Sequence, residues 1–432
     1  MSWPLALLGL LALGAGGVAL LVFRASPKAA FVIWMLVLCF VPVWIGATAG
    51  FFWAAITAVT LVAIAANLRD LRLSVVDAIV ALFVVLVVAL FALQLASLAA
   101  TVIAVLEWVV PYLWGRLVLT RLSTDFVTRV IAAVATAVAV VALVEFATGV
   151  NVFVGIPGPG PYAEWSTLQP RASFVRAEGA FGHSIALGAS LAMAAPFIVA
   201  ARWRAPLTLL ALALAVGAIV VTFSRIGIVT VGIAVALSLL LLPDVARGAR
   251  WAIGVGGAIA IAMIVPFIGG VFTDAGDEAG GSADYRTGLL TLVSEVQLLG
   301  SAGDWSSRTV DGTYLGTFAR SVDNTLLLIG LRFGWLPVLL VLAVFAAIAL
   351  GALRRRSDPA TIAVVSQIPA LFAVALITQF GMLLWFLIGL SVAWRLRPTD
   401  AGSHGADEAG LAPPVGLSPP APVRLHRGGV AP

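Results

Sequence analysis

The sequence predicts an all-α protein that crosses a membrane many times. Hydrophobic residues make up 62% of the 432 residues, charged residues make up 10%, and the mean hydropathy is +1.12. Soluble globular chains average about 45–50% apolar and about 25% charged residues, so this composition excludes an ordinary water-soluble enzyme. Apolar runs of 17 to 26 residues recur from end to end. A spanning helix needs about 20 such residues, whereas barrel strands would give alternating segments of about 10.

Apolar windows separated by charged or turn-forming residues predict 13 spans. The number falls to 12 if either long apolar block, 75–115 or 360–394, is one broken or re-entrant element instead of a helical pair. The first window lacks a basic leader and a small-residue cleavage site, so we expect a retained span and not a signal peptide. The predicted spans are residues 4–23, 29–45, 50–66, 75–93, 97–115, 130–147, 185–201, 205–223, 226–242, 251–271, 324–349, 360–378 and 380–394.

The distribution of cations predicts the orientation of these spans. Every second loop is basic, and these loops together with the C-terminal tail hold 18 of the 25 Lys and Arg residues. Because Lys and Arg are retained on the cytoplasmic side of short loops, we expect the N-terminus outside and the C-terminus on the cytoplasmic side of the membrane. The basic positions in loops are Arg24, Lys28, Arg69, Arg72, Arg116, Arg121, Arg129, Arg202, Arg204, Arg247, Arg250, Arg354, Arg355, Arg356, Arg395 and Arg397.

Two long loops are predicted on the outer side, at about residues 148–184 and 272–323. In the second, the spacing of Leu289, Val293, Val296 and Leu299 predicts an amphipathic helix that begins near Tyr285 and lies on the membrane or on the helical bundle. We therefore divide the chain into a transmembrane domain, residues 1–397, and a tail, residues 398–432. Seven prolines among the 35 tail residues predict a disordered cytoplasmic segment.

Cofactor chemistry has little support in the sequence. The single cysteine, Cys39, lies inside an apolar run, and the three histidines are too few for a cluster, so we expect no disulfide and no metal site. The sequence contains no Asp-x-Asp pair, which often grips a metal-bound nucleotide sugar. We expect membrane lipids as surroundings and no nucleic-acid partner.

Seven arginines fall on the predicted outer side, against the usual bias: Arg171, Arg176, Arg225, Arg286, Arg308, Arg320 and Arg332. Any one of them could simply extend from a helix end to lipid headgroups. Arg225 is unusual because Ser224 and Arg225 stand between two adjacent spans with almost no loop. Arg176, Arg286 and Arg320 are close in sequence to spans and could converge on it. Several guanidiniums at one place favour a phosphate ligand, and they can stabilise a departing diphosphate without a metal.

A general base on the outer side has six candidates: Glu164, Glu178, His183, Asp284, Glu295 and Asp323. Asp323 is the strongest because it opens a span, is followed by Asn324 and has Arg320 one turn earlier. The structural alternative is that Asp323 is only a helix N-cap. His183 also precedes a span and could be only an interfacial residue. Asp77, Glu107 and Glu145 are acids within apolar segments, which favours function by default, although two of them lie close to span ends.

Four segments, in this order, resemble the O-antigen ligase and polymerase superfamily, membrane enzymes that build bacterial surface polysaccharides. They cover about residues 170–340. The segments are Arg176-Ala-Glu-Gly179-Ala-Phe-Gly-His183 before a span, Thr222-Phe-Ser224-Arg225 between two spans, Tyr285-Arg286 at the start of the amphipathic helix, and Asp323-Asn324 followed by Gly330 and Gly334.

The resemblance implies a metal-independent, inverting glycosyl transfer at the outer face of the membrane. The donor would be a glycan on undecaprenyl diphosphate, and the acceptor a glycan or lipid-glycan. By position, Arg176, Arg225 and Arg286 would hold the diphosphate, and Asp323 or His183 would be the base. The ligase branch resembles His-Asn where this chain has Asp323-Asn324, which favours a polymerase or a ligase for another acceptor. The further substrate contacts expected are His183, Glu178, Ser224, Arg320, Asn324 and Tyr285.

The main alternative is a transporter or flippase for an anionic or lipid-linked substrate. It predicts ionisable or Gly/Pro-broken positions near mid-membrane and two pseudo-symmetric halves. The sequence has no internal repeat and concentrates its polar residues in the two outer loops. A purely structural role would leave the outer arginines without a purpose.

Overall fold

The computed structural model describes residues 3–171, 174–243, 245–274, 285, 287–303, 305–307, 309–310, 313–314, 322–354 and 357–397. The chain divides into one unit from Met1 to Arg395 and a second from Leu396 to Pro432. The predicted disordered tail, 398–432, lies outside the described residues. Helices dominate the first unit, and its described strands form short two-stranded antiparallel sheets.

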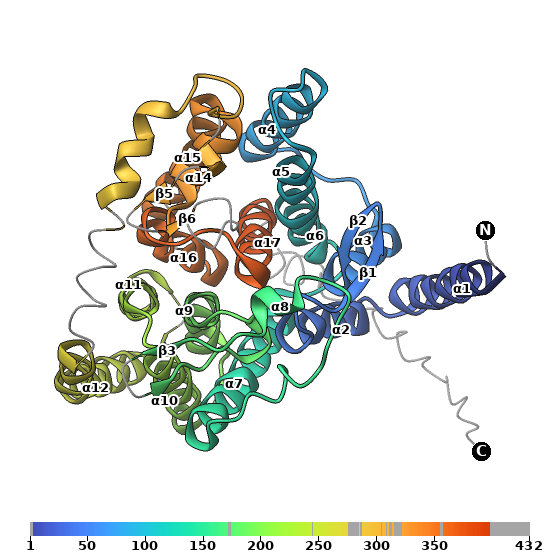
Figure 1. Cartoon of the computed structure of the whole chain (residues 1–432). Helices are drawn as coiled ribbons and strands as arrows, with labels where there is room; N and C mark the ends of the chain where they lie inside the picture. The colour runs from blue at the N-terminus through green and yellow to red at the C-terminus, as the bar shows by residue number, and fades with distance from the viewer. Residues whose placement is uncertain are drawn as a thin grey trace, which may run out of the picture. The chain divides into compact units, whose positions relative to one another are not determined.

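The first part of the chain is built from apolar helices joined by short turns (Figure 1). A hairpin precedes α3 and pairs Gly46 with Ala54. Serine is the N-cap of α2, α4 and α7: the side chains of Ser26, Ser74 and Ser123 each accept a hydrogen bond from a backbone N–H of the first turn. The elements are α1 (Trp3–Ala25), α2 (Pro27–Phe40), β1 (Gly46–Ala49), β2 (Phe51–Ala54), α3 (Ala55–Asn67), α4 (Val75–Ala92), α5 (Leu98–Ile103), the π-helical turn η1 (Ala104–Val109), α6 (Val110–Val118) and α7 (Thr124–Thr148).

The remaining elements include two almost fully buried helices, α9 and α17. In Figure 1, α17 lies between α6 and α16 and close to α9, all of which it contacts. The elements are α8 (Tyr162–Trp165), β3 (Pro170–Arg171), β4 (Phe174–Val175), η2 (Gly179–Phe181), α9 (Ser184–Ala200), α10 (Ala205–Val221), α11 (Arg225–Leu241), α12 (Arg247–Asp274), η3 (Leu290–Glu295), η4 (Trp305–Ser307), β5 (Thr309–Val310), β6 (Thr313–Tyr314), α14 (Thr325–Phe333), α15 (Trp335–Arg354), α16 (Pro359–Ser366), η7 (Ile368–Phe372) and α17 (Thr378–Arg395).

Close packing of α6 against α17 depends on two glycines. A Cβ atom on Gly115 would overlap the carbonyl oxygen of Phe386, and one on Gly389 would overlap that of Tyr112. Small residues allow the two backbones to approach, which is the usual way in which helices associate in membranes.

Four helical segments of the described chain are long and apolar enough to cross a membrane: Val75–Ala92, Leu98–Val118, Thr124–Thr148 and Trp335–Leu353. Other apolar helices among the described residues have 10 to 17 residues. The prediction of a mostly helical protein with apolar, membrane-compatible helices is confirmed at this level. A helix occupies part of every predicted span, whereas the number of 12 or 13 spans stays a prediction.

The two long apolar blocks behave differently. Block 75–115 forms α4 and a second helix that continues from Leu98 to Val118 through η1, as expected for a helical pair. In block 360–394, however, α16 ends at Ser366, η7 follows, and α17 begins only at Thr378. Pro369 lies at the start of η7 and has no backbone N–H to continue an α-helix. The helix in the predicted span 360–378 is therefore interrupted after Ser366, and the number of membrane crossings in this block stays a prediction.

The predicted span 324–349 is also two helices and not one. Gly334 separates α14 from α15 with a φ of +93°. A side chain on Gly334 would collide with the backbone of residues 298–299. The Leu298 carbonyl also accepts a hydrogen bond from Leu336 N–H, so the two segments are in close contact. Only the second helix, α15, is long enough to cross a membrane.

The amphipathic helix predicted from Tyr285 to Leu299 is shorter and tighter than expected. Residues 287–289 are helical, η3 is a 3-10 helix, and the chain is extended from Val296. The buried side chains are Leu289, Leu292 and Val296, while Val293 and Leu299 are 37% and 41% exposed. The predicted apolar face is therefore correct at two of its four positions.

Several loops predicted to be cytoplasmic are bonded to one another. The Arg121 guanidinium donates to Asn67 Oδ1 (3.0 Å) and to the Arg24 carbonyl (3.1 Å), which joins three basic loops. Arg116 Nε pairs with Asp77 Oδ1 at 2.7 Å, and Asp77 also closes the capping box of α4. Asp77 therefore has a structural role, although its place in an apolar segment favoured a functional one.

Candidate functional site

The N-termini of α9, α11, α14 and α17 are tied together by hydrogen bonds. Before α9, Arg176 Nε donates to the Thr222 carbonyl (2.8 Å) and Ala177 N–H to the Val221 carbonyl (3.2 Å), just before α11. At the start of α17, Gln379 Nε2 donates to the Ala180 carbonyl of η2 (3.1 Å). These contacts bring three helix starts to one region.

The fourth helix start, that of α14, joins the region through Thr325. Its hydroxyl donates to the Val374 carbonyl, in the segment that leads into α17. Each helix N-terminus carries a partial positive charge from its unpaired N–H groups. A helix start of this kind favours an anion placed close to it.

The predicted motifs supply the N-caps of three of these helices. His183 Nδ1 accepts from Ile185 N–H (3.2 Å), Ser224 Oγ accepts from Gly227 N–H (3.1 Å), and Asn324 Oδ1 accepts from Leu327 N–H (2.9 Å). Ser224 and Asn324 therefore have a structural role in the helix starts, and their predicted contact with substrate stays a prediction.

Glycines bring α9 and α11 unusually close. A Cβ atom on Gly188 would lie 2.9 Å from Thr222 Oγ1, and one on Gly227 would lie 3.3 Å from the Gly188 carbonyl carbon. The turn between α10 and α11 is equally tight, because Phe223 adopts a φ of +48°. A non-glycine residue rarely takes this left-handed conformation, and strain of this kind concentrates at functional sites.

Arg176 and Arg225 flank this turn. Arg176 is only 8% exposed, and its Nη1 also lies 3.5 Å from Gln169 Oε1. Arg225 is exposed and is the first residue of α11, three positions after the carbonyl that Arg176 binds. The structure thus brings two of the four predicted arginine segments together. Arg286 and Arg320 lie outside the described residues, as does Arg308 and the side chain of Arg171.

Asp323 is not the N-cap of α14, because the next residue, Asn324, fills that position. The structural alternative for Asp323 is therefore wrong. Its side chain is half-buried and lies within electrostatic range of Tyr285. Burial, and then the negative charge of Asp323, raise the pKa of Tyr285 to about 12.

His183 is buried at the start of α9, and its ring lies 6.3 Å from that of Trp165 in an edge-on arrangement. Because Nδ1 accepts a backbone hydrogen bond, this nitrogen carries no proton, and in the neutral ring the proton is on Nε2. A neutral imidazole in this tautomer donates through Nε2 and has no second lone pair for a substrate proton. This geometry favours Asp323 over His183 as the base.

Glu178 is fully buried, and its Oε1 accepts from Gln169 N–H (3.1 Å) within the first outer loop. The backbone of Glu178 and Gly179 in turn binds Glu145, an acid of α7 whose place in an apolar segment favoured a functional role, although it lies close to a span end. The sequence signal for Glu145 was a carboxylate in an apolar helix, but nothing in the sequence indicated its partner.

Glu107 and Arg332 are electrostatic partners outside this region. Glu107 belongs to η1, Arg332 to the last turn of α14, and each lies within range of the other's charge. Arg332 is one of the seven arginines predicted on the outer side, and Glu107 lies within electrostatic range of it.

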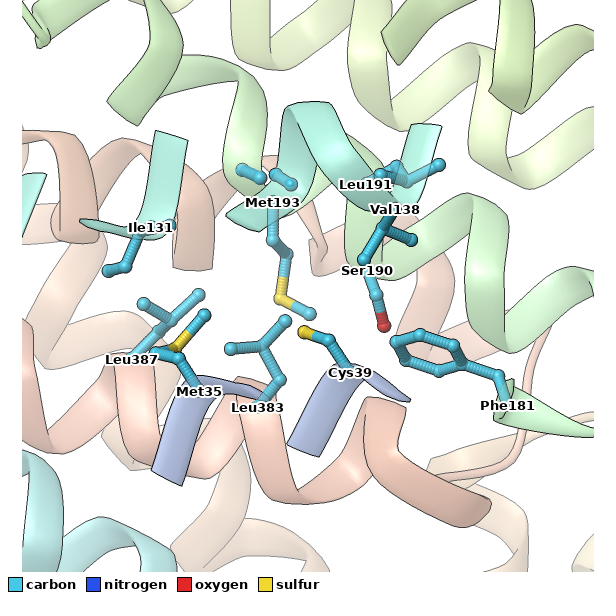
Figure 2. A pocket seen from close by; sticks show the side chains of 12 residues that line it. Met35, Cys39, Ile131, Val138, Phe181, Ser190, Leu191, Met193, Leu383 and Leu387 are labelled. Atoms are coloured by element: carbon cyan, nitrogen blue, oxygen red, sulfur yellow. The ribbon is translucent and has the colours of Figure 1, made fainter. Parts of the chain in front are cut away.

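A small apolar cavity of about 20 Å³ lies below η2, between α2, α7, α9 and α17. Figure 2 shows the Ser190 hydroxyl and the Cys39 thiol among the otherwise hydrocarbon and thioether groups that line it. It is too small and too apolar for a sugar or a diphosphate. Within the described residues, no three His, Cys, Asp or Glu side chains are grouped in a way that could hold a metal ion.

No protein-family model, no curated protein and no solved structure matches the chain.

Proposed function

We propose that this protein is a membrane glycosyltransferase that polymerises or ligates glycans carried on undecaprenyl diphosphate, at the outer face of a bacterial inner membrane. The observation that carries the proposal is the gathering of four helix N-termini, with Arg176 and Arg225 beside one of them. Such an arrangement suits a diphosphate, because it combines fixed N–H dipoles with guanidiniums whose geometry matches phosphate oxygens.

The proposed reaction is a single inverting displacement. An acceptor hydroxyl oxygen attacks the anomeric carbon of the donor sugar, and Asp323 takes the hydroxyl proton as the new C–O bond forms. The bond between the anomeric carbon and the diphosphate oxygen breaks, and its electron pair leaves on undecaprenyl diphosphate. Arg176, Arg225 and, by the sequence resemblance, Arg286 stabilise this developing charge.

The test is glycosyl transfer by the purified protein in lipid nanodiscs, with an undecaprenyl-diphosphate-linked oligosaccharide as donor and the product resolved by mass spectrometry. We expect Arg225→Ala to reduce transfer by about 10²- to 10³-fold, as for loss of one group that stabilises a developing anion. The matched control is Arg129→Ala, an exposed arginine near the start of α7, which should retain normal transfer.

A second test uses cells. A polysaccharide-deficient strain expressing Arg225→Ala or Arg286→Ala variants that still insert into the membrane should make little or no glycan. Glycan of normal length and amount with both variants would contradict the proposal.

A transporter or flippase is the second candidate, because two observations favour it. The chain is broken between α16 and α17, and two ionisable residues in apolar helical segments, Glu107 and Arg332, lie within electrostatic range of each other. Movement of a labelled lipid-linked substrate across liposomes containing the purified protein, without any glycan product, would select this candidate.

A further inference from the structure

Glu145 holds the first outer loop through three hydrogen bonds that converge on one buried carboxylate. Its Oε1 accepts from Glu178 N–H (3.0 Å) and from Asn151 Nδ2 (2.9 Å), and its Oε2 accepts from Gly179 N–H (2.8 Å). Gly179 has a φ of +55°, which turns its N–H toward the carboxylate. The side chain is 5% exposed, so these bonds form away from bulk water.

A second set of bonds continues from this carboxylate to Arg176. Glu178 Oε1 accepts from Gln169 N–H (3.1 Å), and the Gln169 carbonyl accepts from Arg176 N–H (3.2 Å). Arg176 Nε then reaches the Thr222 carbonyl (2.8 Å) before α11. A chain of hydrogen bonds therefore runs from α7, through the loop, to the turn that carries Arg225.

We infer that Glu145 is a positioning residue that acts through Arg176: it fixes the backbone of residues 178–179 so that the Arg176 guanidinium stays against the α10–α11 turn. This role rests on the proposed function, in which Arg176 contacts the donor diphosphate. A carboxylate is needed because three donors require two acceptor oxygens, and an amide supplies only one.

The central experiment is a double-mutant cycle for glycosyl transfer in nanodiscs, with Glu145→Gln and Arg176→Lys. We expect Glu145→Gln alone to lower kcat by about 10- to 100-fold, the range caused by misplacing a catalytic group by about 1 Å. In the Arg176→Lys background, the same change should cost less than about 2-fold, because the guanidinium that Glu145 positions is already absent. Equal costs in the two backgrounds would overturn the inference.

The matched control is Asp358→Asn. Asp358 is also a buried acid that accepts a backbone N–H, from Thr361 at 2.9 Å, at the start of α16. Its neutralisation should leave kcat within about 2-fold of the wild type and should combine additively with Arg176→Lys. This comparison separates the positioning of Arg176 from the general effect of neutralising a buried acid.

Hydrogen–deuterium exchange of the wild type and Glu145→Gln gives a readout that does not depend on activity. We expect faster exchange in residues 174–183 of the variant and unchanged exchange in α17. Unchanged exchange in residues 174–183 would overturn the inference. If the loop loosens but the wild type transfers no glycan, Glu145 still holds the Arg176 segment and the proposed function is the part that fails.

Discussion

Asp323 and His183, the two candidate bases, differ in whether they cap the helix that follows them. His183 Nδ1 accepts a hydrogen bond from the backbone of α9, so its lone pair is already engaged. In α14 it is Asn324 whose side chain accepts the capping hydrogen bond. Asn324, and not Asp323, therefore supplies the N-cap of α14. The amino acid next to Asp323 thus decides what Asp323 can do.

Substitution at these two positions should have unequal effects. We expect Asp323→Asn to lower kcat for glycosyl transfer by about 10²- to 10⁴-fold, the usual contribution of a general base. His183→Asn should retain most of the activity, because asparagine is also a good N-cap. Steady-state rates of both variants in nanodiscs test this, and a greater loss with His183→Asn would reverse the assignment.

Asp358 predicts a pH effect on stability. Burial raises the pKa of this carboxyl above its ordinary value of 3.8, against the opposing effect of its bonds to Thr361. Above pH 3.8 the unfolded state loses the proton first, so the free energy of unfolding falls as pH rises through the folded-state pKa. Thermal unfolding of the wild type and Asp358→Asn from about pH 4 to 7 should show the wild type losing stability relative to the variant as pH rises. A constant difference would contradict this account.

At the scale of elements, helix packing depends on where glycine faces a neighbouring backbone. Gly389 of α17 lies against the Tyr112 carbonyl of α6, whereas Gly217 of α10 has only the Leu143 side chain at an ordinary 3.7 Å. The same residue type is therefore essential for close packing at one position and replaceable at the other.

Gly389→Ala should lower the free energy of unfolding by about 1 to 3 kcal/mol, the usual cost of overfilling a packed interface. Gly217→Ala should be neutral or stabilising by up to about 1 kcal/mol, because alanine is the better helix former. Thermal unfolding in the same detergent measures both effects. Equal behaviour of the two variants would show that α6 and α17 are not as closely packed as described.

At the scale of the whole molecule, the orientation predicted from the basic loops can be tested by labelling from outside the cell. Cys39 is the single cysteine of the sequence and is buried, so we expect no background labelling of the native chain. A membrane-impermeant maleimide should label Thr48→Cys, an exposed position of the β1–β2 hairpin predicted outside. Asp70→Cys, in an exposed loop predicted inside, should be labelled only after the membrane is permeabilised. The opposite pattern would invert the proposed topology and place the arginines on the cytoplasmic side.

The sequence by itself determined the helical, membrane-compatible class, because composition and apolar run length depend only on which residues are present. The predicted spans 226–242 and 324–349 begin within one residue of α11 and α14, although the capping residue of α14 is Asn324 and not Asp323. Hydropathy alone did not mark the breaks in 324–349 and 360–378, because Gly334 and Pro369 stand inside apolar runs. The signal for these breaks is the backbone chemistry of glycine and proline and not their hydropathy. Only the tertiary structure paired Glu145 with Glu178 and Arg176 with Thr222. Those partners are 33 and 46 positions apart, and hydrogen bonds over such separations depend on how the helices pack.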